Sequence, residues 1–520
     1  MTTVVTSGPQ QSIARPAGFK RALLTTCVMC AAILQTLDST IANVALPYMQ
    51  GSLSATSDQI TWVLTSYVVA AAIFTAPVGW LAAHFGRKRL FLVCVIGFTA
   101  ASALCGMATS LGAIVAFRLL QGMFGAALVP LSQATMLDLY PPEQRGSAMA
   151  VWGVGVMVGP ILGPTLGGYL TDTYDWRWVF LINVPFGILA GIGLIVFMRE
   201  TSRHHGLRFD WIGFTVLSLG LGSLQLMLDR GEQQDWFHSS EIVAELVLAC
   251  LGIYLFVVHL FTADSPFIPP RIFKDMNFTA GFLIMFAIGM ILLSSMALLP
   301  PYLQNLGGYS ITTTGVLMAP RGVGTMLAMV VAGRLASRSD PRLLMLFGIL
   351  LICYSMWRMI GWTPDVDEWS LAMTTFMQGV GLGFVFIPLQ VVAFATLPAD
   401  LRGDGTALFS LVRNVGSALG ISISSFLLTQ GTQIMHARIA EGITPFHRGL
   451  QNSGAYLFWN SVTAPGKAAL NAEVTRQASI IAYANDFKFM LCVSLATAAL
   501  LLLLRRPPVA APSVASAAAE

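Results

Sequence analysis

The chain has 520 residues, of which 55% are hydrophobic and only 10% are charged, and its formal net charge is +4. A water-soluble domain of this length could not bury so much apolar surface. The seven cysteines stand in or beside apolar runs, which argues against a disulfide framework and against a redox or zinc site. Motifs of zinc peptidases, serine hydrolases and phosphate-binding loops do not occur, so we expect neither an enzyme nor an ATP-driven pump.

Long apolar runs, separated by short charged or Pro/Gly-rich breaks, predict an all-α polytopic membrane protein. Fourteen transmembrane helices are predicted, at residues 21–46, 58–82, 90–108, 111–137, 146–170, 177–198, 209–228, 241–262, 278–302, 312–336, 342–361, 369–396, 405–429 and 484–504. An even number places both termini on one side. Basic residues concentrate at the termini and after even-numbered spans, whereas the short loops of the other side hold only Arg177 and Arg230. The positive-inside rule therefore predicts cytoplasmic termini and an external loop at 430–483.

The first span carries an acidic residue, Asp38. It precedes Pro47 by nine residues, or about 13 Å at helical rise, which places the carboxyl group near the middle of the membrane. An ionised carboxylate is unfavourable there, and burial favours its protonated form, which suits reversible proton binding. We therefore predict that Asp38 couples transport to protons. The alternative is a structural Asp satisfied by nearby hydroxyl and amide groups such as Thr40 or Asn43.

The short loop between spans two and three holds Gly79, Gly86, Arg87 and Lys88. Its glycines permit a tight turn, and its cations can face carboxylates at span ends or the C-termini of helices. We predict a cytoplasmic gating loop. A simple positive-inside anchor would explain the cations but not the glycines.

Span four carries a second intramembrane charge, Arg118. An arginine does not release its proton, so it cannot carry one, but it can tune the protonation of a nearby carboxylate. We predict Arg118 as the proton-coupling partner. The alternative is a side chain that extends to the outer interface, because Arg118 lies near the start of its span.

Span five contains glycines at every fourth residue, which on a helix form one face without side chains. Such a face permits close contact with another helix, and each following proline removes a backbone donor and bends the helix. The motif comprises Gly155, Gly159, Pro160, Gly163, Pro164, Gly167 and Gly168. One interpretation is a tightly packed, kinked structural helix. The order of these residues also resembles the antiporter signature in the fifth span of drug exporters of the major facilitator superfamily.

An internal repeat predicts two bundles. The motif at Gln121-Gly122 in span four returns at Gln378-Gly379 in span twelve, eight spans later. Two six-span halves in direct succession would be offset by six spans, so spans seven and eight are an insert. We predict a cytoplasmic tail at 1–20, a six-helix bundle at 21–200, a two-helix insert at 201–265, a second six-helix bundle at 266–504 that includes the loop 430–483, and a cytoplasmic tail at 505–520. Arg413, deep in span thirteen, needs a partner that the sequence does not identify, and it is a possible secondary site with Gln121 and Gln378.

Several of these motifs together resemble the fourteen-span drug:proton antiporters. They are the Asp38 segment, the Arg118 motif, the span-five motif and Trp178-x-Phe180-x-x-Asn183-x-Pro185. Residues 223–237 look like those of the EmrB-type multidrug efflux permeases. One departure is Ala83, where the loop motif of the family usually carries an Asp; a gating salt bridge built on that Asp is therefore in doubt.

The resemblance implies a major facilitator fold in the bacterial inner membrane, with proton-coupled export of small hydrophobic or amphipathic toxic compounds. It also implies a periplasmic adaptor of the EmrA type and an outer-membrane channel. Because the loop 430–483 is long, follows an odd-numbered span and is polar, we expect the adaptor to dock there; the alternative is a flexible insertion without a role. Besides these partners, protons and membrane lipid, we expect no cofactor, no metal and no nucleic acid. The alternative within the same fold is a dedicated exporter of one metabolite or siderophore.

Overall fold

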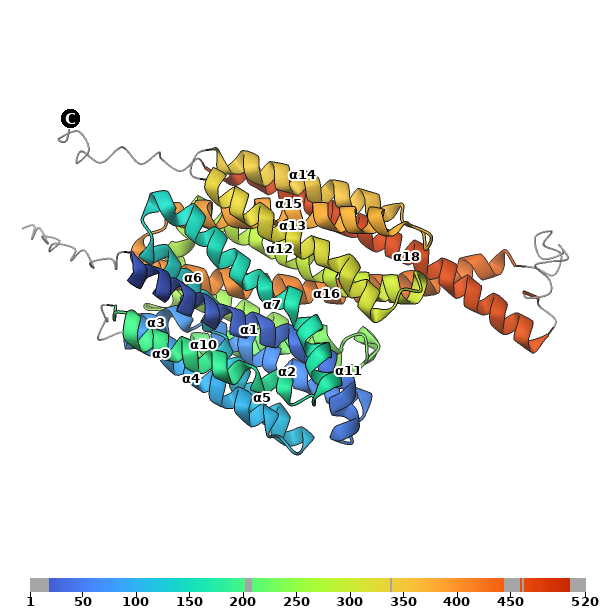
Figure 1. Cartoon of the computed structure of the whole chain (residues 1–520), viewed down its shortest axis with the longest axis horizontal. Helices are drawn as coiled ribbons and strands as arrows, with labels where there is room; N and C mark the ends of the chain where they lie inside the picture. The colour runs from blue at the N-terminus through green and yellow to red at the C-terminus, as the bar shows by residue number, and fades with distance from the viewer. Residues whose placement is uncertain (1–17, 202–207, 337–338, 444–458, 461–462, 506–520) are drawn as a thin grey trace, which may run out of the picture.

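The computed structural model describes residues 18–201, 208–336, 339–443, 459–460 and 463–505. Thirteen of its helices are long and apolar enough to cross a membrane, and the bent pair α2–α3 brings the number to fourteen. The predicted all-α polytopic fold is confirmed. The chain enters its first helix and leaves its last at the same end of the bundle, at the left of Figure 1. We call this end the terminal face and the other end the opposite face.

The first half consists of six spans, three of which are broken into two helices. They are α1 (Phe19–Ser52), α2 (Ser57–Thr75) with α3 (Val78–Phe85), α4 (Arg87–Gly106), α5 (Leu111–Gly125) with α6 (Leu128–Leu139), α7 (Arg145–Thr173) after the short η1 (Pro142–Gln144), and α8 (Trp178–Leu181) with α9 (Asn183–Phe197). The helices of the pair α2–α3 meet at an angle of 58°. Pro77 lies at this break, because its ring has no N–H to continue the first helix.

The six spans of the second half are more continuous than those of the first. They are α12 (Met276–Pro301) with η4 (Tyr302–Leu306), α13 (Ile311–Leu335), α14 (Pro341–Ile360), α15 (Glu368–Ala395), α16 (Arg402–Glu441) after η5 (Ala399–Leu401), and α18 (Ala464–Leu500) with η6 (Leu501–Leu503). Short polar side chains begin many of these helices: Asp275 and Asp367 each accept hydrogen bonds from backbone N–H groups of the first turn.

Corresponding glycines make the same contacts in the two halves. A side chain on Gly122 of α5 would collide with the backbone of Tyr67 in α2, and one on Gly379 of α15 would collide with the backbone of Arg321 in α13. Likewise α7 packs on α1, as α16 packs on α12. The repeat seen in the sequence is therefore a repeat of helix packing, offset by eight spans.

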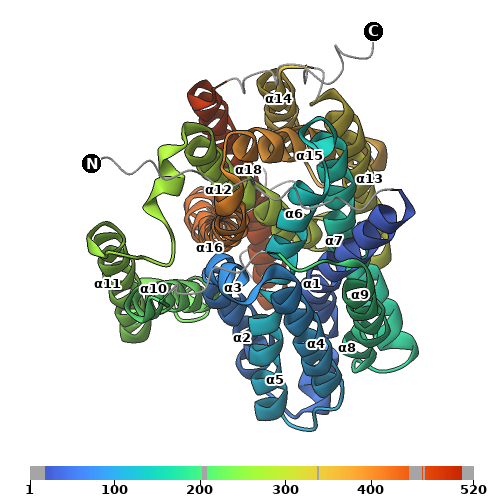
Figure 2. The ribbon, with the colours of Figure 1, turned by 90° about the vertical axis from the view of Figure 1, so that its left-hand side faces the viewer.

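The two remaining helices, α10 (Trp211–Arg230) and α11 (Ser240–Thr262), stand beside the bundle and are joined by η2 (Trp236–His238). Figure 2 shows α10 next to the bundle and α11 at its outer edge. α10 packs against α2 of the first half and α16 of the second. Only 17% of the most apolar stretch of α11 is buried, as expected for a helix that faces lipid.

The segment 430–483, expected as a long loop, is largely helical. α16 contains 40 residues and α18 contains 37, so each is about 55–60 Å long, against a hydrocarbon core of about 30 Å. Both helices therefore continue past the other spans as a helical hairpin on the opposite face, at the right of Figure 1. Residues 471–481 are part of the continuous helix α18. Residues 444–458 and 461–462 lie outside the described residues, as do most of the two expected tails.

The halves meet most closely near the terminal face. A Cβ added to Gly146 of α7 would lie 2.5 Å from the carbonyl oxygen of Gly333 in α13. The Gln133 amide of α6 donates a hydrogen bond to the side-chain oxygen of Gln390 in α15. The rings of Trp152 and Phe386 also stack across this interface, with centroids 6.2 Å apart. These contacts close the space between the halves at the terminal face.

Candidate functional site

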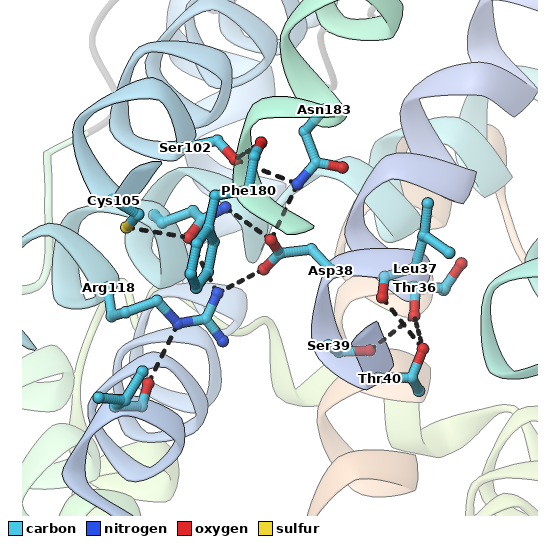
Figure 3. Close-up of polar contacts among 12 residues, drawn as sticks. Thr36, Leu37, Asp38, Ser39, Thr40, Ser102, Cys105, Arg118, Phe180 and Asn183 are labelled. Carbon is cyan, nitrogen blue, oxygen red and sulfur yellow. Dashed lines mark hydrogen bonds and ion pairs between the residues drawn. The ribbon is translucent and has the colours of Figure 1, made fainter. Parts of the chain in front are cut away.

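Asp38 lies in the interior of the first half and is 0% exposed. Its Oδ2 accepts a hydrogen bond from Nη1 of Arg118 in α5 at 2.6 Å, which is also an ion pair. Its Oδ1 accepts from Nε2 of Gln121 at 2.8 Å and from Nδ2 of Asn183 at 2.9 Å. Figure 3 shows Arg118 of α5 and Asn183 of α9 converging on the carboxylate of Asp38, which belongs to α1. The carboxylate is thus fully satisfied, with one charged and two neutral donors.

Arg118 is held by several groups besides Asp38, and its side chain is only 1% exposed. Its Nε donates to the carbonyl oxygen of Val63 in α2 at 3.1 Å, and its Nη1 also donates to Oε1 of Gln121 at 2.9 Å. The guanidinium lies over the Tyr67 ring, 4.1 Å from the centroid, in cation–π geometry. Arg118 is therefore an interior residue, and the alternative of an interfacial side chain is wrong.

The nearby polar residues of α1 do not satisfy Asp38. Thr40 donates instead to its own helix and, at 3.1 Å, to the carbonyl oxygen of Gly159 in α7. Asn43 is exposed. The partners of Asp38 come from elsewhere in the chain, so the alternative of local satisfaction by Thr40 or Asn43 does not describe this site.

The glycines of α7 form the surface on which α1 lies. A Cβ on Gly159 would lie 2.5 Å from the carbonyl carbon of Thr36, and one on Gly163 would collide with the Thr40 hydroxyl. A Cβ on Gly167 would lie 2.9 Å from the carbonyl oxygen of Ile41. Because these neighbours include backbone atoms, α1 could not keep its position if the glycines carried side chains. The glycine face therefore positions the helix that carries Asp38.

The other motif residues contribute less to this contact. Gly155 faces the flexible end of Met29, and a Cβ on Gly168 would lie 3.9 Å from Val44, an ordinary contact. The helix α7 runs without interruption through Pro160 and Pro164. Of these two prolines, the side chain of Pro164 lies outside the described residues.

The segment predicted as a gating loop is built differently from that prediction. Gly79 lies inside α3 and not in a loop, and the turn itself is at Gly86, whose φ of 91° favours glycine. Lys88 Nζ donates to the carbonyl oxygen of Ile195 at 2.7 Å. Arg87 Nη1 pairs with Oδ2 of Asp138 at 2.6 Å. The cations of this segment therefore bind the ends of spans in their own half, as the sequence suggested.

Asp138 also connects the two halves. While its Oδ2 holds Arg87, its Oδ1 accepts from Nη1 of Arg402 in α16 at 3.0 Å. One carboxylate therefore ties two guanidinium groups, one from each half, at the terminal face. Sequence reasoning missed this residue, because Asp138 and Arg402 are 264 positions apart and no motif links them.

A second contact at the terminal face involves Asp404, in the first turn of α16. Its carboxylate and backbone lie against Gly79 at the start of α3, where any side chain on Gly79 would collide with them. This chain has Ala83 in place of the family's usual Asp, and it presents an acidic residue from the other half to the same segment.

The possible secondary residues differ in their surroundings. Gln121 belongs to the Asp38 site, as described above. Its counterpart Gln378 is buried, and both side-chain polar atoms lack a hydrogen-bond partner among the described residues. Arg413 is half-buried, and within the described part of the chain no carboxylate pairs with it. The second half therefore does not repeat the ion pair of the first.

Comparison with known proteins places this architecture in a family. The model of the Major Facilitator Superfamily matches residues 28–421. Multidrug export protein EmrB of Escherichia coli (strain K12) is 35% identical over 476 residues, which cover 91% of this chain and 93% of that protein. Fatty acid resistance protein FarB of Neisseria gonorrhoeae is 34% identical over 467 residues, covering 89% and 92%.

A solved structure shows the same fold. The MFS proton:xylose symporter XylE, bound to 6-bromo-6-deoxy-D-glucose, matches with a TM-score of 0.59 at 12% identity, covering 93% of this chain and 95% of its own. The resemblance to EmrB-type permeases and the expectation of a transporter rather than an enzyme are both confirmed. The chain is a multi-pass membrane transporter that belongs to the Major Facilitator Superfamily.

Proposed function

We propose that this transporter exports hydrophobic or amphipathic toxic compounds across the bacterial inner membrane in exchange for protons. The observation that carries the proposal is the buried ion pair of Asp38 and Arg118, on a helix held by the glycine face of α7. Its similarity to Multidrug export protein EmrB supports export of more than one compound. The basic residues at the terminal face support cytoplasmic termini.

Protonation of Asp38 changes the site in a defined way. The ionised carboxylate binds Arg118, whereas a protonated carboxyl group loses the ion pair. The guanidinium keeps the carbonyl oxygen of Val63, the side chain of Gln121 and the face of Tyr67 as partners. Arg118 can therefore remain buried and charged in both protonation states. The proton binds and leaves at Asp38, and Arg118 supplies the attraction that opposes binding.

The helix α7 can carry this change to the interface between the halves. On one side α7 touches Thr36 and Thr40, which flank Asp38 in α1. On the other side α7 packs on α13 of the second half, where Ile161 faces Gly322. A shift of α1 on protonation thus reaches the second half through a single helix. Proton and substrate then shift the same equilibrium between two conformational states, because each ligand binds one state more tightly than the other.

Transport in liposomes tests the proposal. The purified chain is reconstituted with a pH-sensitive dye inside, and chemically unrelated hydrophobic drugs are added under an imposed pH gradient. Wild type should move protons in response to each transported drug, and Asp38→Asn should abolish the response while the protein remains folded. The matched control is Asp365→Asn, because Asp365 is exposed in the loop between α14 and α15. Wild-type proton flux in Asp38→Asn would remove Asp38 from the mechanism.

We further propose that the chain works with a periplasmic adaptor and an outer-membrane channel, and that the adaptor binds the helical hairpin of α16 and α18. The hairpin projects from the opposite face, beyond the length needed to cross the membrane. Its two helices are linked where Nε2 of His436 lies 3.0 Å from Oδ1 of Asn471. Within this projecting part the Trp459 ring is 40% exposed, so it is available for a partner.

A second candidate is dedicated export of one class of compound. It is favoured by the 34% identity to a protein named for fatty acid resistance. It is also favoured by Arg321, a buried cation whose Nη2 donates to the Leu292 carbonyl oxygen at 3.0 Å and whose Nη1 has no partner among the described residues. Such a group suits a substrate that carries a carboxylate. Export of amphipathic carboxylates alone, with no response to neutral or cationic drugs, would favour this candidate.

A further inference from the structure

The second half contains a buried carboxyl group that the proposed mechanism does not use. Asp486 in α18 is 0% exposed, and neither of its carboxylate oxygens has a hydrogen-bond partner among the described residues. An ionised carboxylate without partners is strongly disfavoured in such surroundings, so this conformation holds the group with its proton. A carboxyl group that is neutral in one conformation and ionised when water or a cation reaches it is a proton-binding site.

The position of Asp486 corresponds to a residue of the Asp38 site. Span fourteen is the counterpart of span six, because the repeat is offset by eight spans. Asn183 lies fourteen residues before Phe197, the last residue of α9, and Asp486 lies fourteen residues before Leu500, the last residue of α18. Asp486 therefore has the same position relative to the end of its helix as Asn183, which binds Asp38 in the first half. The second half has a carboxyl group at this place instead of an amide.

Within the described part of the chain, no charged side chain of the neighbouring helices pairs with Asp486. α12 has no titratable side chain. In α14 the thiol of Cys353 is buried, whereas Tyr354 and Arg358 are exposed. α16 contributes Arg413, which forms no ion pair with Asp486 within the described residues. The titratable group beside Asp486 is the phenol of Tyr483 in α18, whose ring centroid lies 5.2 Å from that of Tyr302 in η4.

A cavity at the opposite face is lined in part by Tyr483, which precedes Asp486 by three residues in α18. Its volume is about 330 Å³, and its polar lining comes from α16, α18 and η4: Asn305, Thr429, Thr432, Gln433, Ser479 and Tyr483. A cavity of this size with hydroxyl and amide groups can hold water. Ser479, Tyr483 and Asp486 follow one another at helical spacing on one face of α18. Tyr483 thus lines the cavity and is also the next residue toward it from Asp486 on this face of α18.

We propose that Asp486 is a second proton-binding residue of this transporter, loaded from the opposite face through the cavity bordered by Tyr483. This inference rests on the proposed proton-coupled export and adds a second carboxyl group to it. When Asp38 releases its proton, the carboxylate pairs with Arg118. When Asp486 releases its proton, the carboxylate is hydrated by water that enters along Tyr483. The transporter then moves one more proton per cycle than Asp38 alone would carry.

Infrared difference spectroscopy tests proton binding directly. Spectra of the purified chain at acid and alkaline pH are subtracted, and the carbonyl stretch of protonated carboxyl groups is followed. Asp486→Asn should remove one component of this band and leave the component that Asp38→Asn removes. Asp365→Asn, a change at an exposed position, should leave both of these components in the band. If Asp486→Asn does not fold, Asp486→Glu is used instead, because this substitution should shift the infrared band of the carboxyl group at position 486. A band identical to that of wild type, in whichever variant folds, would overturn the proposal.

Counting protons in liposomes separates this proposal from the proposed function. The ratio of protons to substrate should fall by one in Asp486→Asn, with substrate still exported. An unchanged ratio would overturn the role of Asp486 in transport and leave that of Asp38 intact. If wild type shows no proton movement with any substrate, the proposed export mechanism fails, while the infrared band still decides whether Asp486 binds a proton. Tyr483→Phe should slow loading of Asp486 from outside without changing the final band.

Discussion

The hydroxyl group of Thr40 donates a hydrogen bond to the carbonyl oxygen of Gly159, 3.1 Å away, and so joins α1 to α7 two residues after Asp38. This bond is possible because Gly159 has no side chain: a Cβ there would lie 2.5 Å from the backbone of Thr36. The helix that carries Asp38 and the helix that touches the other half are thereby held at backbone distance.

The first prediction concerns this contact. Gly159→Ala should lower stability by about 1–3 kcal/mol, because the added methyl group overpacks a contact between backbones. Transport should fall by a larger factor than in Gly168→Ala, where the new Cβ would make only an ordinary contact at 3.9 Å. Apparent melting temperature in detergent and drug-driven proton flux in liposomes measure the two effects. Equal tolerance of both substitutions would show that the glycine face is not needed for close packing.

The second prediction concerns the buried ion pair. Arg118→Gln leaves the Asp38 carboxylate without its cation, which for a buried pair costs about 3–5 kcal/mol. Protonation of Asp38 removes the unpaired charge, so the loss should be largest at alkaline pH and shrink as pH falls. The double variant Asp38→Asn/Arg118→Gln should be less destabilised than the sum of the single variants. Additive losses at all pH values would mean that the two side chains do not interact.

The sequence was sufficient to predict Asp38 and Arg118, because charged residues inside apolar spans are few and unfavourable. It did not predict Tyr67 or Val63 as partners, because a tyrosine and a backbone carbonyl in a span carry no signal of their own. Asp486 was missed for a related reason. Its span was predicted to start at residue 484, which made Asp486 an interfacial residue, whereas α18 begins at Ala464 and buries it.

The helical hairpin was missed because span prediction follows hydropathy. The residues after span thirteen become polar, and a polar segment was expected to leave the helix. Residues 430–441 nevertheless contain good helix formers and no proline, so α16 continues into water to Glu441. Contacts between the halves, such as that of Asp138 with Arg402, were not predictable because they depend on how two separate bundles dock.

The third prediction concerns the closure at the terminal face. Asp138→Asn should weaken the link to Arg402 and let the halves separate there more often. A cysteine introduced at Gln390, which is buried at this interface, should then react faster with a water-soluble maleimide. Arg271→Gln is the matched control, because its ion pair with Asp400 joins residues of the second half only. If both variants leave the reaction rate unchanged, the ion pair does not hold the closed state.

The last prediction concerns the helical hairpin and the adaptor. The hairpin can be shortened without disturbing the bundle, because His436 and Asn471 lie close together and a short linker can span them. Replacing residues 437–470 with a Gly/Ser linker keeps every residue of the cavity near Tyr483. Transport in liposomes should therefore remain at the wild-type rate, whereas resistance to drugs in whole cells should be lost, because export past the outer membrane needs the adaptor.

A second variant, joined at the same residues, separates the effect of the hairpin's length from that of its surface side chains. Restoring the hairpin with an unrelated helical hairpin of equal length should not restore resistance, since the proposed contact is made by this chain's own side chains. Resistance that survives the Gly/Ser replacement would mean that the adaptor docks elsewhere. The most suitable remaining surface on the opposite face is then the connection between α10 and α11, where Arg230 pairs with Glu241 and the Trp236 ring lies 5.6 Å from that of Phe426. Charge reversal at Glu241, with the hairpin shortened, would decide whether this connection carries the contact.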